Sequence, residues 1–218
     1  MRKKKLNDYL LAGSGKYSFY MKHNPLLFFS IFVKTQQTPN PHFLKFFPGK
    51  ELFSDGETYD FSNMKEATIS PLARKLFEVN GITRVFYGKD YISVGKKELT
   101  EWDELRPLIV DTICDYFTKN LELFDEKPEP EDTQIKDTDS ETVALIKEII
   151  STRVRPVVQE DGGDIKFINF DTESGTVFVA MKGSCSGCPS SGVTLKNGIE
   201  KMLVHYVAEV KSVEAVDD

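Results

Sequence analysis

The sequence predicts an α+β protein built as two small α+β domains joined by an acidic flexible linker. Strand-like and helix-like segments mix on both sides of residues 121–139, a stretch without apolar periodicity. A length of 218 residues also suits two small domains. We expect the first domain at 36–120 and the second at 140–218.

The predicted first domain combines strands with two helices. Ser70 is placed to cap a short helix that begins with Pro71, because serine is a preferred N-cap and proline is tolerated in the first helical position. Gly88-Lys89-Asp90 separates two apolar runs, as in a hairpin. The predicted strands are Phe43–Phe47, Ile82–Tyr87 and Tyr91–Val94, and the predicted helices are Pro71–Phe77 and 101–119.

Residues 121–139 are predicted to be the linker. Between Glu122 and Glu141 there are nine acidic residues, opposed only by Lys127 and Lys136. Like charges repel one another, and a segment with so little apolar surface cannot form a core, so this composition is typical of a solvated spacer. A specific acidic interaction tail is the alternative interpretation.

The predicted second domain has the order helix, strand, strand, loop, helix, strand. Thr138 and Glu141 fit a capping box for the first helix, which should end or kink near Pro156. Asp161 and Asp164 flank two glycines, where turn chemistry is favoured over a catalytic role. The predicted strands are Ile165–Phe170, Thr176–Lys182 and Val210–Val216, and the last helix is 192–206.

Residues 1–35 are predicted to be a targeting presequence. They contain seven Lys and Arg residues against the single acid Asp8, a balance expected of a mitochondrial presequence, although such segments usually favour Arg over Lys. The apolar stretch Pro25–Val33 has the length of a signal-peptide core, but it lies late and is followed by Lys34. A disordered, solvated tail is the third interpretation.

The net charge and the apolar pattern exclude two classes of partner. The formal charge is −6 for the whole chain and +6 for residues 1–35, which leaves −12 for the remainder. An acidic body argues against nucleic acid as the main partner, because phosphate binding needs clustered cations. No apolar run approaches the roughly 20 residues that span a bilayer, so we expect no membrane span.

Cys185 and Cys188 are the candidate metal ligands. They form a C-x-x-C pair in a loop rich in glycine and serine, between a predicted strand and a predicted helix. Cys114, the third cysteine, is expected to be a small buried hydrophobe. His42 has no second ligand at metal spacing, and His205 lies about five helical turns from Cys188 by the helical repeat, too far for a shared metal.

Three chemistries use such a cysteine pair. Thiol–disulfide exchange is one, but the sequence shows no further thioredoxin-like βαβ pattern and no candidate cis-proline. A tetrahedral zinc site needs four ligands, and the chain offers no second C-x-x-C. An iron–sulfur cluster also takes four thiolates, which two chains related by a two-fold axis would supply together.

The residues around the cysteine pair suit a shared cluster. The small residues Gly183, Ser184, Ser186 and Gly187 are expected to keep bulky side chains away from the two-fold axis. They should also leave backbone N–H groups free to point at sulfur. Lys182 and Lys196 are available to offset the negative charge of a cluster. A cluster held by two thiolates per chain would exchange readily with a recipient's thiols, which favours a carrier over an enzyme or an electron-transfer centre.

Distinctive motifs are spread over both predicted domains. They are Gln159–Asp164, Gly183–Ser191 and Thr194–Glu200 in the second domain, and Gln37–Pro41, Leu44–Phe46, Pro48-Gly49, Ser70–Ala73 and Leu76-Phe77 in the first. In these motifs the chain closely resembles the Nfu (NifU C-terminal-like) iron–sulfur scaffold proteins. The resemblance covers roughly residues 36–216, and the two-domain arrangement is similar to the mitochondrial form of eukaryotes.

The resemblance implies a non-enzymatic, late-acting scaffold or carrier in the mitochondrial matrix. Such a protein binds a 4Fe-4S cluster between the subunits of a homodimer, and Cys185 and Cys188 match the family's ligands. Its implied partners are other cluster-assembly factors and apo iron–sulfur recipients such as lipoyl synthase or respiratory-chain subunits.

Overall fold

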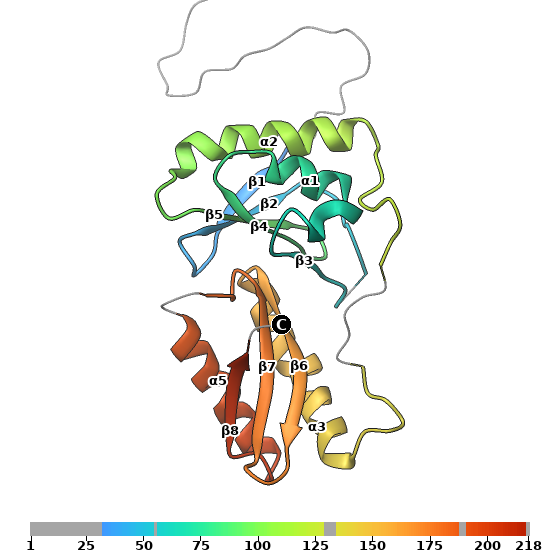
Figure 1. The fold of residues 1–218 in the computed structure, drawn as a ribbon, viewed down its shortest axis with the longest axis vertical. Helices are drawn as coiled ribbons and strands as arrows, with labels where there is room; N and C mark the ends of the chain where they lie inside the picture. Colours follow the sequence, from blue (N-terminus) through green and yellow to red (C-terminus); the bar gives the residue numbers. More distant parts are fainter. Residues whose placement is uncertain (1–31, 55, 129–133, 188–190, 217–218) are drawn as a thin grey trace, which may run out of the picture. The chain divides into compact units, whose positions relative to one another are not determined.

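The computed structural model describes residues 32–54, 56–128, 134–187 and 191–216, without the side chains of 191–194. Residues Ile31–Asp218 form one compact unit, in which the described helices and strands surround two hydrophobic cores (Figure 1). The mixed α+β class expected from the sequence is confirmed. Most of the predicted presequence, and Cys188, lie outside the described residues.

The first core lies between a five-stranded antiparallel sheet and two α-helices. The strand order is β1-β2-β5-β4-β3, and helices α1 and α2 cover one face of the sheet (Figure 1). The first strand begins at Lys34, two residues before the predicted start of the domain. The elements are β1 Lys34–Gln37, β2 Phe43–Phe47, β3 Tyr59–Phe61, a 3₁₀ turn Glu66–Ile69, α1 Pro71–Phe77, β4 Ile82–Tyr87, β5 Ile92–Lys96 and α2 Trp102–Thr118.

Side-chain alternation gives this sheet two different faces. Leu44, Val85 and Val94 belong to the hydrophobic core under the helices. Their strand neighbours Lys45, Arg84, Phe86 and Ser93 point to the opposite face because successive side chains in a strand alternate. Lys45, Phe86 and Ser93 are nevertheless buried, and Lys45 and Arg84 contact residues of the second half of the chain.

The predicted cap of α1 is confirmed. The Ser70 hydroxyl accepts a hydrogen bond from the Ala73 N–H at 3.3 Å, and Pro71 is the first helical residue. The same hydroxyl donates to the Leu123 carbonyl at 2.7 Å and lies 2.9 Å from the Tyr87 hydroxyl. Ser70 therefore joins the helix, the sheet and the segment after α2.

The start of the predicted linker is packed against the first core. Phe124 is 9% exposed and contacts the aromatic rings of Tyr59 and Tyr87, and the Asp125 N–H donates to the Ile69 carbonyl at 3.0 Å. The ordered first domain thus extends at least to Asp125. Phe124 supplies the apolar anchor that the acidic composition of the segment concealed.

The second core lies between a three-stranded sheet and its helices. The strand order is β6-β7-β8, in which β6 and β7 are antiparallel and β7 and β8 are parallel. Helix α5 is the crossover between the two parallel strands, so β7, α5 and β8 form a βαβ unit. The elements are α3 Glu141–Ile149, a π-helical turn Ile150–Val154, α4 Arg155–Glu160, β6 Gly163–Asp171, β7 Thr176–Gly183, α5 Ser191–Tyr206 and β8 Ser212–Val216.

One local prediction at the start of the second domain is wrong. The N-cap of α3 is Ser140, whose hydroxyl accepts from the Val143 N–H at 3.3 Å, and not Thr138. Asp139 accepts hydrogen bonds from the Lys136 N–H and from Lys147, which holds the preceding residues in a turn. Near Pro156, where the sequence predicts an end or a kink of the helix, the π-helical turn Ile150–Val154 interrupts the α-helix, and Pro156 occupies the first turn of α4.

We expect Ser70→Ala to lower the free energy of unfolding of the first domain by about 2 kcal/mol, because it removes a helix cap and leaves the buried Tyr87 hydroxyl without this partner. Urea unfolding followed by the fluorescence of Trp102, the single tryptophan of the chain, measures the effect. Thr118→Ala is the matched control, since its exposed hydroxyl bonds only within α2, and it should change stability by less than about 0.5 kcal/mol.

Candidate functional site

The candidate site is the loop that leaves β7 and leads to α5. Cys185 lies two residues after the end of β7 and is 6% exposed, within the second hydrophobic core. Its side chain lines a cavity of about 170 Å³ together with Leu195, Lys196 and Ile199 of α5. Since Cys188 is outside the described residues, the structure places one of the two predicted ligands.

The turn Asp161-Gly162-Gly163 accepts two hydrogen bonds from the cysteine loop. The Ser184 hydroxyl donates to the Asp161 carbonyl at 2.5 Å, and the Ser184 N–H donates to the Gly162 carbonyl at 3.3 Å. Gly163 pairs with Gly183 at the ends of β6 and β7. The two glycine segments that stand 20 residues apart in the sequence are thus in direct contact.

Neither glycine of this pair leaves room for a side chain. A Cβ on Gly163 would lie 2.8 Å from Cys185 Sγ and closer still to the Lys182 carbonyl oxygen. A Cβ on Gly183 would lie 2.8 Å from the Gly162 carbonyl oxygen, and Gly183 also has a positive φ of 58°. The position of Cys185 therefore requires glycine at both Gly163 and Gly183, because no larger residue fits at either position.

The expectation of free backbone N–H groups in the loop is wrong for three of its residues. The N–H groups of Ser184, Cys185 and Ser186 donate to the carbonyls of Gly162, Lys182 and Gly183 at 3.2–3.3 Å. The N–H groups of Cys185 and Ser186 close two consecutive tight turns, and that of Ser184 bonds to the Asp161-Gly162-Gly163 turn. None of the three points at sulfur, because a buried N–H needs an acceptor. Cys185 Sγ lies 4.0 Å from the Val158 carbonyl oxygen and 3.9 Å from the Ser184 hydroxyl.

Asp164 has a structural environment. It is 4% exposed, accepts from Arg155 Nε at 3.0 Å and from the Thr58 hydroxyl at 2.6 Å, and binds the Ile165 N–H at 2.7 Å. Burial raises the pKa of the Asp164 carboxyl, while Arg155 opposes that shift. A carboxylate with all these partners anchors the start of β6, where Asp164 is a strand residue and not part of the predicted turn.

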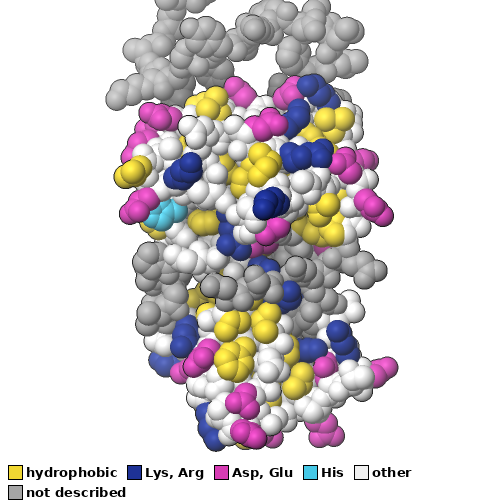
Figure 2. Space-filling model, viewed as in Figure 1, with side chains coloured by type: hydrophobic (Ala, Val, Ile, Leu, Met, Phe, Trp, Pro, Cys, Tyr) yellow, Lys and Arg dark blue, Asp and Glu magenta, His cyan; other side chains and the backbone are white. Residues whose placement is uncertain are grey.

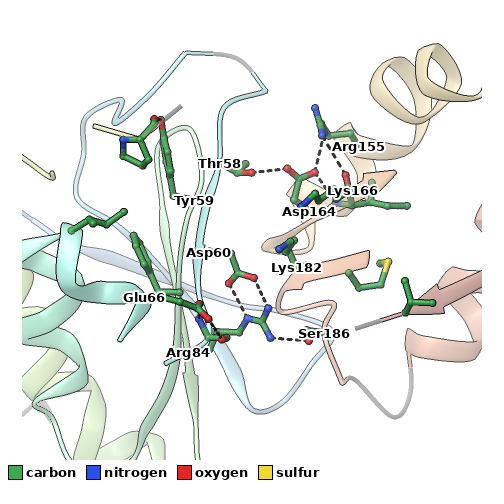
Figure 3. Close-up of a pocket in the computed structure, with 17 residues that line it drawn as sticks. Thr58, Tyr59, Asp60, Glu66, Arg84, Arg155, Asp164, Lys166, Lys182 and Ser186 are labelled. Carbon is green, nitrogen blue, oxygen red and sulfur yellow. Dashed lines mark hydrogen bonds and ion pairs between the residues drawn. The ribbon is translucent and has the colours of Figure 1, made fainter. Parts of the chain in front are cut away.

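Residues of the first domain, on β3, on β4 and in the turn between β1 and β2, also contact the cysteine loop. Arg84 Nη1 donates to the Ser186 hydroxyl at 2.8 Å, and Asn40 Nδ2 donates to the Ser184 carbonyl at 2.9 Å. Asp60 accepts from Arg84 and, at 3.4 Å, from the Gly183 N–H. Figure 3 shows Arg84 between Asp60 and Ser186.

Asp60, Arg84 and Ser186 border a charged cavity of about 680 Å³. In Figure 3 the pairs Arg84–Asp60 and Arg155–Asp164 lie on its walls, with Lys166 and Lys182 also facing it. Lys182, the residue expected to offset cluster charge, thus lines this cavity, whereas Lys196 lines the smaller cavity beside Cys185.

The remaining candidate residues lie apart from the loop. Cys114 is partly buried against the first core, as expected, and burial raises the pKa of its thiol. His205 is exposed on α5 and packs edge-on against Tyr206. Among the residues that the structure describes, no group of three or more His, Cys, Asp and Glu side chains is placed to hold a metal.

The face of the molecule drawn in Figure 2 shows no dominant charge. On the face drawn in Figure 2, basic and acidic side chains alternate, and hydrophobic side chains gather on the lower part. None of the described helices is both long enough and apolar enough to cross a bilayer.

Sequence reasoning did not identify the contacts of Asn40, Asp60 and Arg84 with the loop. Asp60 and Arg84 lie on strands β3 and β4, and a charged residue inside an otherwise apolar strand such as Ile82–Tyr87 was the available signal. β3 itself was not predicted because three residues are too few for a period-2 pattern. The partners are more than 100 residues away in the sequence, so no local pattern could connect them.

Two family models match the chain. Residues 33–120 match the model described as scaffold protein Nfu/NifU N terminal, and residues 146–214 match the NifU-like domain. The second match contains the cysteine loop and the glycine turn beneath it, and the first contains Asn40, Asp60 and Arg84.

Similar proteins are found in animals and plants. The chain is 51% identical over 189 residues to the Drosophila persimilis protein named NFU1 iron-sulfur cluster scaffold homolog, mitochondrial, which covers 87% of this chain and 66% of that protein. It is 50% identical over 187 residues to NifU-like protein 5, mitochondrial, of Arabidopsis thaliana, covering 85% of this chain and 68% of that protein. The chain thus spans about two thirds of the length of these relatives.

A solved structure also aligns with the chain. The solution structure of a NifU-like protein from Saccharomyces cerevisiae matches with a TM-score of 0.42 and 24% identity, over 52% of this chain and 100% of that one.

We expect Gly163→Ala to displace the cysteine loop, because the added Cβ would overlap the Lys182 carbonyl and approach Cys185 Sγ. The variant should lower the midpoint of thermal unfolding and accelerate alkylation of Cys185, as measured by peptide mass spectrometry. Gly198→Ala is the control: nothing lies within 4 Å of its added Cβ, and alanine is the better helix former by about 1 kcal/mol. Equal behaviour of the two variants would contradict the close-approach argument.

Proposed function

The chain belongs to the Nfu family of iron–sulfur cluster scaffold proteins, and from this premise we propose that it carries a 4Fe-4S cluster shared between two chains. Its close relatives carry mitochondrial names, and the chain is a mitochondrial protein. We place its work in the matrix, after the first steps of cluster assembly, with the cluster as cargo.

The cysteine loop is the observation that carries this proposal. Its C-x-x-C pair supplies thiolates, the ligands that iron–sulfur clusters prefer. Cys185 lies at the end of a strand whose position is set by a glycine–glycine contact, beside a cavity that is also lined by Lys196. A cationic side chain near thiolates favours a negatively charged cargo.

Two chains are proposed because one chain has too few thiolates. A 4Fe-4S cluster takes four cysteine ligands, and the chain has three cysteines, of which Cys114 lies on α2 in the first domain. Cys185 and Cys188 from each of two chains related by a two-fold axis complete the set. The homodimer of the proposal is therefore held together by its cargo.

A carrier role is favoured over catalysis. Two thiolates per chain hold the cargo from one side, and a recipient's cysteines can replace them one after another. We propose apo iron–sulfur proteins of the lipoyl synthase or respiratory-chain type as recipients, and other cluster-assembly factors as further partners. Such a transfer needs no catalytic residue in this chain, so the chain is proposed not to be an enzyme.

Anaerobic reconstitution with iron and sulfide tests the proposal. We expect a brown species with about two irons per chain, because four irons are divided between two chains, and a dimer by size-exclusion chromatography. Mössbauer spectra identify the cluster type. A 4Fe-4S signal is expected, whereas a 2Fe-2S signal alone would contradict the assigned cargo.

The cysteine variants assign the ligands. Cys185→Ala and Cys188→Ala should each lose most of the bound iron and remain monomeric, while circular dichroism stays unchanged. Cys114→Ala is the matched control and should keep the full iron content, because its thiol lies on α2 of the first domain. A colourless monomer that reduces disulfides catalytically would instead support the thiol–disulfide oxidoreductase alternative.

A further inference from the structure

The ion pair between Arg84 and Asp60 connects the first sheet to the cysteine loop. Arg84 Nε donates to Asp60 Oδ1 at 2.8 Å, and Nη2 donates to Oδ2, so the carboxylate holds the guanidinium in a two-pronged geometry. The remaining Nη1 donates to the Ser186 hydroxyl at 2.8 Å (Figure 3). Ser186 directly follows Cys185, so the fixed guanidinium reaches the residue next to the candidate ligand.

Two further contacts hold the same loop. The Gly183 N–H points to Asp60 Oδ2 at 3.4 Å, and Asn40 Nδ2 donates to the Ser184 carbonyl at 2.9 Å. The Phe86 ring packs so closely on Gly183 that an added Cβ would lie 2.9 Å from it. Both residues before Cys185 and the one after it therefore contact the first domain.

The pair is sheltered from water. The side chain of Asp60 is 7% exposed and that of Arg84 is 19% exposed. Hydrogen bonds to charged groups are stronger in such surroundings than when exposed. Loss of one bond of typical strength shifts the equilibrium between two conformations about ten- to a hundredfold. With the loop held in this position, the Cys185 side chain is 6% exposed and packs in the second hydrophobic core.

We propose that Arg84, fixed by Asp60, is a positioning residue that clamps the cysteine loop in the cluster-free chain and keeps the Cys185 thiol covered. The role of the clamp rests on the proposed function, because a thiolate that is to share a cluster with a second chain has to become accessible to that chain. Arg84 does not touch the cargo. It acts through Ser186.

The clamp makes cluster loading a competition between two states of the loop. A ligand that binds only the open state has its apparent affinity reduced by the fraction of chains that are open. Cluster binding and release of the cysteine loop from the first domain are then linked, and each favours the other. Loosening the clamp should therefore accelerate loading without removing a ligand.

Native-state alkylation of the cluster-free protein tests the clamp directly. Peptide mass spectrometry follows iodoacetamide labelling of Cys185 in the parent, in Arg84→Gln and in Ser186→Ala. We expect labelling of Cys185 to be about tenfold faster or more in both variants, since labelling of a covered thiol tracks local opening. Labelling of Cys114, in the first core, is the internal control and should not change.

A matched variant and a double variant separate positioning from folding. Arg74→Gln removes another arginine of the first domain, whose partner Asp125 is exposed, and should leave Cys185 labelling at the parent rate. In Arg84→Gln/Ser186→Ala, labelling should be no faster than in either single variant, because both remove the same hydrogen bond. Additive effects would show that Arg84 does not act through Ser186 and would overturn the proposal.

Parent-like labelling of Cys185 in Ser186→Ala also overturns the clamp, whatever Arg84→Gln does to folding. Iron and sulfide loading of the same variants then tests the link to function: faster loading to the parent's final iron content is expected, and an unchanged rate would overturn the competition. A parent chain that takes up no iron would refute the proposed cargo, while the alkylation result on the cluster-free protein would still decide the clamp.

Discussion

The close approach of backbone at Gly162, Gly163 and Gly183 is the constraint on which the candidate site depends. The first strand of the second sheet begins, and the second strand ends, at the same contact, and no side chain fits between them. The Cys185 side chain lies against Gly163, so the thiol can occupy its position only because Gly163 has no side chain. A loop of small residues thereby acquires a defined geometry that its own sequence could not impose.

A second constraint comes from the polar face of the first sheet. In a typical two-layer domain this face would be solvated, yet Lys45 and Ser93 are buried there and Arg84 is mostly covered. Burial lowers the pKa of Lys45, whose ammonium donates to the Glu160 carbonyl at 3.1 Å. Buried polar groups need partners, and Lys45 and Arg84 find them at the end of α4 and in the cysteine loop.

Local signals in the sequence predicted the elements that have a clear period or a strong cap. Strand Phe43–Phe47, helix Pro71–Phe77 with its Ser70 cap, and the helix near 101–119 were all found where expected. The signals failed where tertiary contacts decide: Phe124 turned part of an acidic segment into core, and Ser140 replaced Thr138 as a cap because Asp139 is held by Lys147. A strand at Val210–Val216 was expected and is found at Ser212–Val216, but no local pattern predicted that it pairs in parallel with β7.

By itself the sequence determined which residues are candidate metal ligands, because the C-x-x-C spacing, the glycines and the number of cysteines are properties of residue type and order. It also determined the family, through motifs spread over both domains. Only the tertiary structure decided that the Gly162-Gly163 turn supports Cys185 and that Asn40, Asp60 and Arg84 contact its loop. Those contacts join residues 20 to about 140 positions apart, and nothing in local periodicity or propensity encodes which distant surfaces will meet.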